Sequence, residues 1–414
     1  MARLASLTAL RERNLALLVG SATVSSLGSG MAQVALAFAV LHIGGASDLG
    51  FVLLAREIPI VVFLLAGGVW ADRVSRKHLL VWGNILLGAC QAVTASLFLT
   101  GSASVWAVAA LQVGFGVANA FTRPANVGLI PQAVSPEHLQ AANALVDLSR
   151  SIMRIAGPAI GAVIVVAANP GWALAADSAS FFIASTLMLR MRINEGERRP
   201  RRRMLHELRE GWGEFRARQW VWTMVASFGL FQLTLFPAML VLGPVVAKDK
   251  LGGAGAWGAI LAVQSAGAVV GGMLGLHLRP SRPLLASQLL CLPTALFLGL
   301  LGVAPGVWLL AAAGFFGMLG LTCADIFWVT TFQQRVPEHL LSRLSSFDWF
   351  GSTVFNPLGY ALVGPLAGVI GIPATLFGAA AVNAVVVLVI ASTSTIRGTR
   401  AEIPLAEPDP AQAS

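Results

Sequence analysis

Eight charged side chains fall inside stretches that are otherwise apolar, and their types and spacing point to chemistry. They are Arg56, Glu57, Asp147, Arg150, Arg154, Asp177, Asp325 and Asp348. A charge near the middle of a membrane costs roughly 2.5–3.5 kcal/mol for Arg or Asp on insertion scales, so such groups face a cavity or a partner and mark substrate or ion pathways. The chemistry that they support is proton exchange or the binding of a charged substrate group.

Arg56 and Glu57 lie about 12 Å inside their apolar stretch, at 1.5 Å of rise per helical residue. Adjacent residues on a helix point in different directions, so the two need not pair with each other. We expect Arg56 to answer an acid on another helix while Glu57 faces the pathway. The alternative is a buried pair that only docks two helices.

Asp147, Arg150 and Arg154 are spaced i, i+3 and i+7 and therefore share one helical face. Arg150 can neutralise Asp147 within the helix. That leaves Arg154 to bind an anionic substrate group, or to pair with Glu57 or Asp177. A carboxylate on such a face suits proton coupling, because a change of surroundings changes the balance between its neutral and ionised forms.

The remaining acids are less specific. Asp177 lies near the outer end of its stretch, where an interfacial position and a functional one are equally compatible with the sequence. Asp325 lies toward the cytoplasmic end of its stretch and is a candidate for a gate. Asp348 has Arg343 about one helical turn away as its simplest partner.

Several other chemistries are disfavoured by the pattern. The three cysteines and six histidines occur singly, which predicts neither a metal site nor a disulfide framework. No Gly-x-x-x-x-Gly-Lys-Ser/Thr loop is present, so ATP hydrolysis by that route is not expected. We therefore predict a protein that is not an enzyme, that needs no cofactor and that draws energy from a proton gradient.

The elements that position these charges are membrane-spanning helices. The 414 residues are 56% hydrophobic and only 11% charged, against about 25% charged in soluble domains. A helix needs roughly 20 apolar residues to cross a bilayer. Runs of that length predict twelve spans, at residues 14–42, 48–71, 78–99, 103–123, 139–168, 171–190, 219–247, 254–278, 283–302, 305–330, 340–369 and 373–394.

The basic residues gather on one side of these spans. Of the 28 Lys and Arg residues, 23 fall at the chain ends or in alternate connections, and only Lys248 and Lys250 fall in the other set. Positive loops stay in the cytoplasm, so we expect both termini inside and a multi-pass protein of the inner (cytoplasmic) membrane. The net charge of +9 is thereby explained by orientation, and nucleic acid is not expected as a partner.

One long connection divides the chain. We predict a six-helix bundle at 1–190, a basic linker at 191–218, a second six-helix bundle at 219–394 and a disordered cytoplasmic tail at 395–414. In the linker, Leu205, Leu208, Trp212 and Phe215 follow helical spacing. That spacing predicts an amphipathic helix lying on anionic membrane lipids.

An internal repeat supports two related halves. Residues 132–151 align with residues 333–352 and match at seven of twenty positions, with Pro-Glu-His-Leu shared intact. Both copies open a span and carry an acid at the same depth, Asp147 and Asp348. Parallel six-helix repeats of this kind occur in one large group of transporters, whose substrate site lies between the halves.

Two motifs carry a resemblance to the major facilitator superfamily. Gly68, Asp72, Arg73, Arg76 and Lys77 match that superfamily's signature between its second and third helices, with Ser75 in place of a usual Gly. In the fifth span, Gly157, Pro158 and Gly161 resemble the Gly-Pro-x-x-Gly antiporter motif. The wider pattern resembles the branch that contains enterobactin, macrolide and multidrug exporters.

The resemblance implies an all-α membrane protein of twelve transmembrane helices in two pseudo-symmetric bundles. It also implies that Asp72 latches the cytoplasmic side by meeting the start of the eleventh helix. One departure is Gln112, which stands where many proton-driven drug antiporters carry Arg, so their proton route does not transfer to this chain.

The function that we predict is export of a bulky, partly hydrophobic small molecule, such as a drug, antibiotic or siderophore, in exchange for protons. We expect the protein to act as a monomer. Two alternatives remain open, an importer or uniporter of a small metabolite on the same fold and a receptor that does not transport. The eight charges inside the spans weigh against the receptor.

Overall fold

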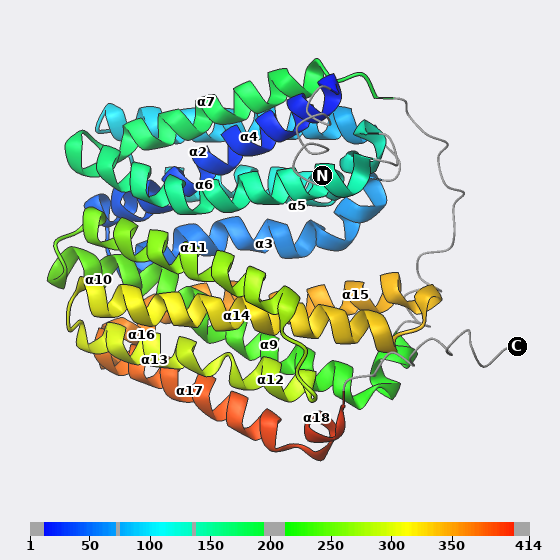
Figure 1. The fold of residues 1–414 in the computed structure, drawn as a ribbon. Coiled ribbons are helices and arrows are strands. Elements are labelled where there is room, and N and C mark those ends of the chain that lie inside the picture. Colours follow the sequence, from blue (N-terminus) through cyan, green and yellow to red (C-terminus); the bar gives the residue numbers. More distant parts are fainter. Residues whose placement is uncertain (1–11, 72–74, 135–137, 194–211, 401–414) are drawn as a thin grey trace, which may run out of the picture.

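The computed structural model describes residues 12–71, 75–134, 138–193 and 212–400, and within those ranges it contains helices and no strands. The helices lie roughly side by side in two groups, one above the other in Figure 1. The first group comprises α2 (Arg13–Ile43), α3 (Ala46–Ala71), α4 (Arg76–Leu99), α5 (Val105–Ala133), α6 (Leu139–Ala167) and α7 (Pro170–Leu189).

The second group contains shorter helices, because three of its predicted spans are interrupted. Its elements are α9 (Gln219–Pro237), the π-helix η2 (Ala238–Leu242), α10 (Gly243–Lys250), α11 (Ala254–His277), α12 (Pro283–Leu289), α13 (Leu292–Val303), α14 (Val307–Arg335), α15 (Glu338–Thr353), α16 (Asn356–Ile370), α17 (Ile372–Ser392) and α18 (Ser394–Gly398). The helices that resume after the breaks, α10, α13 and α16, carry Pro244, Pro293 and Pro357 in their first turns. Proline has no N–H group to donate to the preceding turn, which explains why the breaks occur there.

The predicted spans agree with these helices. Each of the twelve lies on one helix or on consecutive helices, but α5 continues to Ala133, beyond the predicted end at 123, and α14 continues to Arg335, beyond the predicted end at 330. In the described residues, eleven segments are long and apolar enough to cross a membrane. The other predicted span, 48–71, is α3, which has 26 residues and carries Asp48, Arg56 and Glu57. At 1.5 Å per residue it measures about 39 Å, more than the roughly 30 Å of a hydrocarbon core.

The buried apolar residues are distributed differently at the two ends of the molecule. We call the end where α7 stops and α9 starts the linker end, on the right in Figure 1, and the opposite end the far end. One continuous core joins the two groups toward the far end, where Leu36 and Val52 share a cluster with Trp257. At the linker end, the cluster around Leu129 is separate from the cluster around Leu344. Among the described residues, the two halves are therefore closed on each other by a shared apolar core toward the far end, while their cores stay separate at the linker end.

Two helix pairs make this closure, α6 with α11 and α3 with α16. In each pair, the fifth residue of one helix is a glycine that lies against a backbone carbonyl of the other. A Cβ atom on Gly50 would lie 2.6 Å from the Tyr360 carbonyl oxygen, and one on Gly258 would lie 2.9 Å from that of Pro158. Both glycines are required for the close approach. We call these two helix–helix interfaces the far-end seams. They are equivalent under the sequence repeat, which relates α6 to the segment containing α15 and α16.

Candidate functional site

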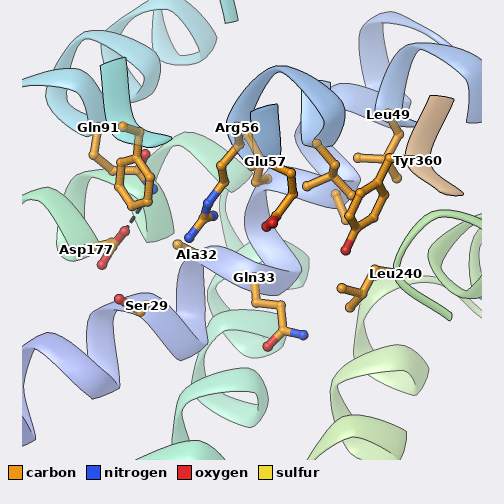
Figure 2. A pocket seen from close by; sticks show the side chains of 14 residues that line it. Ser29, Ala32, Gln33, Leu49, Arg56, Glu57, Gln91, Asp177, Leu240 and Tyr360 are labelled. Atoms are coloured by element: carbon orange, nitrogen blue, oxygen red, sulfur yellow. Dashed lines mark hydrogen bonds between the residues drawn. The ribbon is translucent and has the colours of Figure 1, made fainter. Parts of the chain in front are cut away.

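A polar cavity of about 220 Å³ lies within the first half and is covered by two residues of the second. We call it the charged cavity. Helix α3 supplies Arg56 and Glu57, α4 supplies Gln91 and α7 supplies Asp177, while Tyr360 of α16 reaches in from the second half. Figure 2 shows the Arg56 guanidinium directed toward the space beside Asp177, and the Glu57 carboxylate between that guanidinium and the Tyr360 hydroxyl. Both side chains line the same cavity, so the expectation that Arg56 answers an acid on another helix while Glu57 faces the pathway stays a prediction.

Asp177 is fully buried, so of the two positions left open by the sequence the interfacial one is wrong. Gln91 Nε2 donates a 2.8 Å hydrogen bond to Asp177 Oδ2. Helix α2 approaches closely because residue 28 is glycine, whose Cβ would lie only 2.6 Å from Asp177 Oδ1. Gln91 itself is 2% exposed, and its Oε1 atom has no hydrogen-bond partner among the described residues. The cavity thus holds an unmatched acceptor beside a buried carboxylate.

Arg56 is held mainly by an aromatic ring. Its guanidinium carbon lies 4.4 Å from the centroid of Phe115, within the range of a cation–π interaction. The backbone beneath it packs tightly on α5, where a Cβ on Gly116 would lie 2.2 Å from the Arg56 carbonyl oxygen. The guanidinium is consequently fixed in direction while its N–H groups face the cavity.

A larger cavity of about 500 Å³ lies in the second half and is faced by one residue of the first, and we call it the aromatic cavity. Its aromatic lining comes from α9, α14 and α15 and consists of Phe228, Phe231, Phe236, Trp328 and Trp349. Asp325 of α14 and Asp348 of α15 also line it, and Arg154 of α6 faces it from the first half. Trp328 Nε1 donates a 3.2 Å hydrogen bond to Asp348 Oδ2. The side chain of Arg343, the partner expected for Asp348, lies outside the described part of the chain.

The face of α6 that carries three charges is only partly used by the cavities. Arg150 Nη1 lies 3.9 Å from Asp147 Oδ1, so the predicted pair within the helix is present. The Asp147 side chain is 75% exposed, and neither member of the pair lines a described cavity. Arg154 donates to Ser151 Oγ at 2.8 Å, and the pairing expected with Glu57 or Asp177 is not formed. The structure therefore places Arg154, but not Asp147, at a candidate binding site.

The two motifs have different structural settings. Asp72 and Arg73 lie outside the described residues, as does the environment of Gly68 within α3, so the latch stays a prediction. Arg76 begins α4, and Lys77 Nζ donates a 2.7 Å hydrogen bond to the Met191 carbonyl oxygen just beyond α7. This contact ties the start of α4 to the end of the first half.

The residues of the antiporter motif pack α6 between two neighbours. A Cβ on Gly157 would lie 2.7 Å from the Gly30 Cα, and one on Gly161 would lie 2.6 Å from the Met31 Cα, so α2 and α6 touch along their backbones. On its other side α6 meets α11 at Pro158. The motif thus contributes directly to the seam at the far end.

The linker helix differs from the prediction in one respect. Leu205 and Leu208 lie outside the described residues, whereas residues 212–217 are helical. Phe215 is 8% exposed, and its ring centroid lies 5.8 Å from that of Phe347 on α15. Its apolar side therefore packs on protein at this position, although Trp212 remains half exposed.

Sequence reasoning missed three polar residues. Gln91 and Tyr360 line the charged cavity, and Lys248 Nζ donates to the Leu41 carbonyl oxygen across the two halves at the far end. Two signals were available, because Gln91 is an amide inside an apolar run and Tyr360 is the single tyrosine of the chain.

Comparison with known proteins agrees with this architecture. The family model described as Major Facilitator Superfamily matches residues 18–354. Macrolide efflux protein A of Streptococcus pyogenes is 24% identical over 364 residues, covering 84% of this chain and 88% of that protein. Macrolide efflux protein A of Enterococcus faecalis is 25% identical over 316 residues, covering 73% and 95% of the two chains.

Solved structures share the fold at low identity. A bacterial homologue of the iron transporter ferroportin, in an inward-facing state, has a TM-score of 0.71 at 15% identity and covers 92% of this chain and 99% of its own. A nucleoside transporter has a TM-score of 0.71 at 12% identity, with 91% and 98% covered. Since the family model spans most of the sequence and the twelve predicted spans are helical, this chain belongs to the major facilitator superfamily of membrane transporters.

Proposed function

We propose that this protein exports a bulky, partly hydrophobic small molecule in exchange for protons. The observation that carries the proposal is the aromatic cavity, which lies in the second half, is faced by Arg154 of the first, and has five aromatic side chains and two carboxylates in its lining. Its volume of about 500 Å³ falls within the range of pockets that enclose drug-sized ligands. The carboxylates favour a compound that also carries a positive charge.

Access to this cavity from the linker end is consistent with the substrate-free state of an exporter. Among the described residues, the halves have separate cores at the linker end and a shared core at the far end, and we infer from this that a compound reaches the cavity from the linker end. The distribution of Lys and Arg supports placing that end in the cytoplasm. The relatives named macrolide efflux protein A support outward transport, which would require the far-end seams to part.

Proton exchange is assigned to the charged cavity. With all three groups ionised, Arg56, Glu57 and Asp177 carry one net negative charge in a space lined by protein. Taking up one proton on a carboxylate removes that net charge, which matters because an unbalanced charge inside the membrane is costly. Proton uptake from the far side and release at the linker end would then accompany each outward movement of cargo.

A direct test uses purified protein in liposomes, with a panel of macrolides and cationic dyes and an imposed pH gradient. We expect the gradient to drive transport, and Asp177→Asn or Glu57→Gln to abolish driven transport while exchange of substrate for substrate persists. Asp48→Asn serves as the matched control, because Asp48 lies on the same helix as Glu57 but caps the start of α3 through a 2.8 Å bond to the Gly45 N–H. Transport that ignores the gradient, or equal loss in the control, would overturn the assignment.

A second candidate function is import of a small polar metabolite. The charged cavity itself favours it, because 220 Å³ and three charged groups suit a small zwitterion better than a bulky compound. The same liposomes separate the two functions. Import predicts that amino-acid-sized zwitterions accumulate and compete for uptake, whereas export predicts that only the larger amphipathic compounds do.

A further inference from the structure

Tyr360 occupies an unusual place for a residue of the second half. It belongs to α16, yet its side chain lines the charged cavity, whose charged groups all come from the first half. It is 4% exposed, and Figure 2 shows its hydroxyl directed into the same space as the Glu57 carboxylate. Leu240 of η2 lies beside it and is the other residue that the second half contributes. These two side chains form the cover of the cavity.

The backbone holds Tyr360 in place through the α3–α16 seam. A Cβ on Gly50 would lie 2.6 Å from the Tyr360 carbonyl oxygen, and one turn further along α16 a Cβ on Gly364 would lie 2.5 Å from the Ser47 Cα. Because α16 contacts α3 at Tyr360 itself and again one turn further along, Tyr360 cannot stay in the cavity once α16 separates from α3. Its presence therefore reports that the far end is closed.

We propose that Tyr360 is the residue that denies far-side water to the charged cavity until the α3–α16 seam opens. The proposal rests on the proton exchange assigned to Glu57 and Asp177, and it identifies the step that makes this exchange conditional on conformation. The ring fills the path between the seam and the Glu57 carboxylate, and the hydroxyl gives that end of the cavity a polar group. When α16 moves away, the ring leaves and the cavity meets water from the far side.

The single tyrosine makes this mechanism open to a direct measurement. Protein grown with 3-fluorotyrosine carries one fluorine resonance from the native chain, and a water-soluble gadolinium chelate relaxes that resonance more strongly the more closely the chelate can approach the ring. We expect protection in the unmodified protein. Gly364→Val should expose the ring by forcing α16 from Ser47, with a several-fold larger relaxation enhancement. Gly368→Val is the matched control, since a Cβ there meets nothing within 4 Å.

Proton entry into liposomes without substrate gives the second readout. We expect Tyr360→Ala to admit protons several-fold faster than the unmodified protein, and Tyr360→Phe to stay close to it because the ring remains. Leu366→Ala on the exposed face of α16 should leave proton entry unchanged. Proton entry that stays as slow in Tyr360→Ala as in the unmodified protein would contradict the role of the ring as the barrier.

The two measurements test different parts of the proposal. If the fluorine resonance is already exposed in the unmodified protein, or if Gly364→Val leaves it protected, the inference about Tyr360 is wrong whatever the proton data show. If the resonance behaves as expected but neither substrate nor any variant makes proton entry detectable, the cover is real and the proposed proton exchange is wrong.

Discussion

Gly258 provides a sharp prediction about the conformational balance of this transporter. It lies on α11 in the far-end seam, where an added Cβ would fall 2.3 Å from the Ala162 Cβ and 2.9 Å from the Pro158 carbonyl oxygen. The second of these atoms belongs to the backbone and cannot turn aside. Gly258→Ala should therefore disfavour the far-end-closed state and leave the opposite state, in which the seam is parted, without that clash.

The size of the effect follows from the geometry. Overpacking a well-packed contact costs about 1–3 kcal/mol, which corresponds to a change of roughly 5- to 150-fold in the ratio of the two states. Gly255 is the matched control, because it lies one turn earlier on the same helix and a Cβ there would be 3.8 Å from the Val166 Cγ2. Gly255→Ala should leave the ratio unchanged.

Spin labels can measure this ratio. Cysteines introduced at the exposed positions Asn143 and Ser346 place one label on α6 and one on α15, both near the linker end. The native Cys90, Cys291 and Cys323 are buried, which limits their labelling. Gly258→Ala should increase the population with a short distance between the labels. Equal shifts in the Gly255 and Gly258 variants, or no shift in either, would refute the reasoning.

Three further outcomes are expected. Lys248→Met removes an ammonium group that donates a hydrogen bond to the last turn of α2. A hydrogen bond involving a charged group usually contributes about 1.5–3 kcal/mol, so the balance between the closed and open states of the far end should shift toward opening by that amount and raise the labelling of a thiol at the far end. Trp328→Phe removes the donor to Asp348 and should weaken binding of cationic dyes more than binding of their neutral analogues in a fluorescence titration. Gln91→Leu removes the amide that donates to the buried Asp177 carboxylate, so it should lower the unfolding temperature in a scanning assay and slow the proposed proton-driven transport. Gln91→Glu carries a donor only when protonated, so it should retain a higher unfolding temperature and faster transport at low pH than at high pH.

The spans were predictable because the bilayer imposes them. A backbone in hydrocarbon must satisfy its own hydrogen bonds, so length and composition locate most helix ends to within a few residues. The end of α5 at Ala133 is the exception, because a helix can continue past the apolar run that predicts the span. The interruptions inside predicted spans were not drawn from the sequence, although Pro244, Pro293 and Pro357 mark where the new helices start.

The site was predictable in its parts and not in its pairings. Charges inside spans identified Arg56, Glu57 and Asp177, and they also identified Asp147, which the structure leaves largely exposed. Spacing along one helix decides which residues share a face, but the contact of Gln91 with Asp177 depends on how α4 packs against α7. Interactions between separate helices are set by packing and could therefore not be predicted from the sequence.

The shared core at the far end and the divided cores at the linker end have a thermodynamic consequence. A form that is open at the far end has to split the shared core, and it recovers apolar contacts only if the two linker-end clusters, around Leu129 and Leu344, come together. One interface is dissolved while its counterpart is assembled, so the free energy between the two forms is a small difference between two large terms. Binding of a single substrate molecule or one proton can then change which form predominates, because a difference of a few kcal/mol between its affinities for the two forms suffices to reverse their populations.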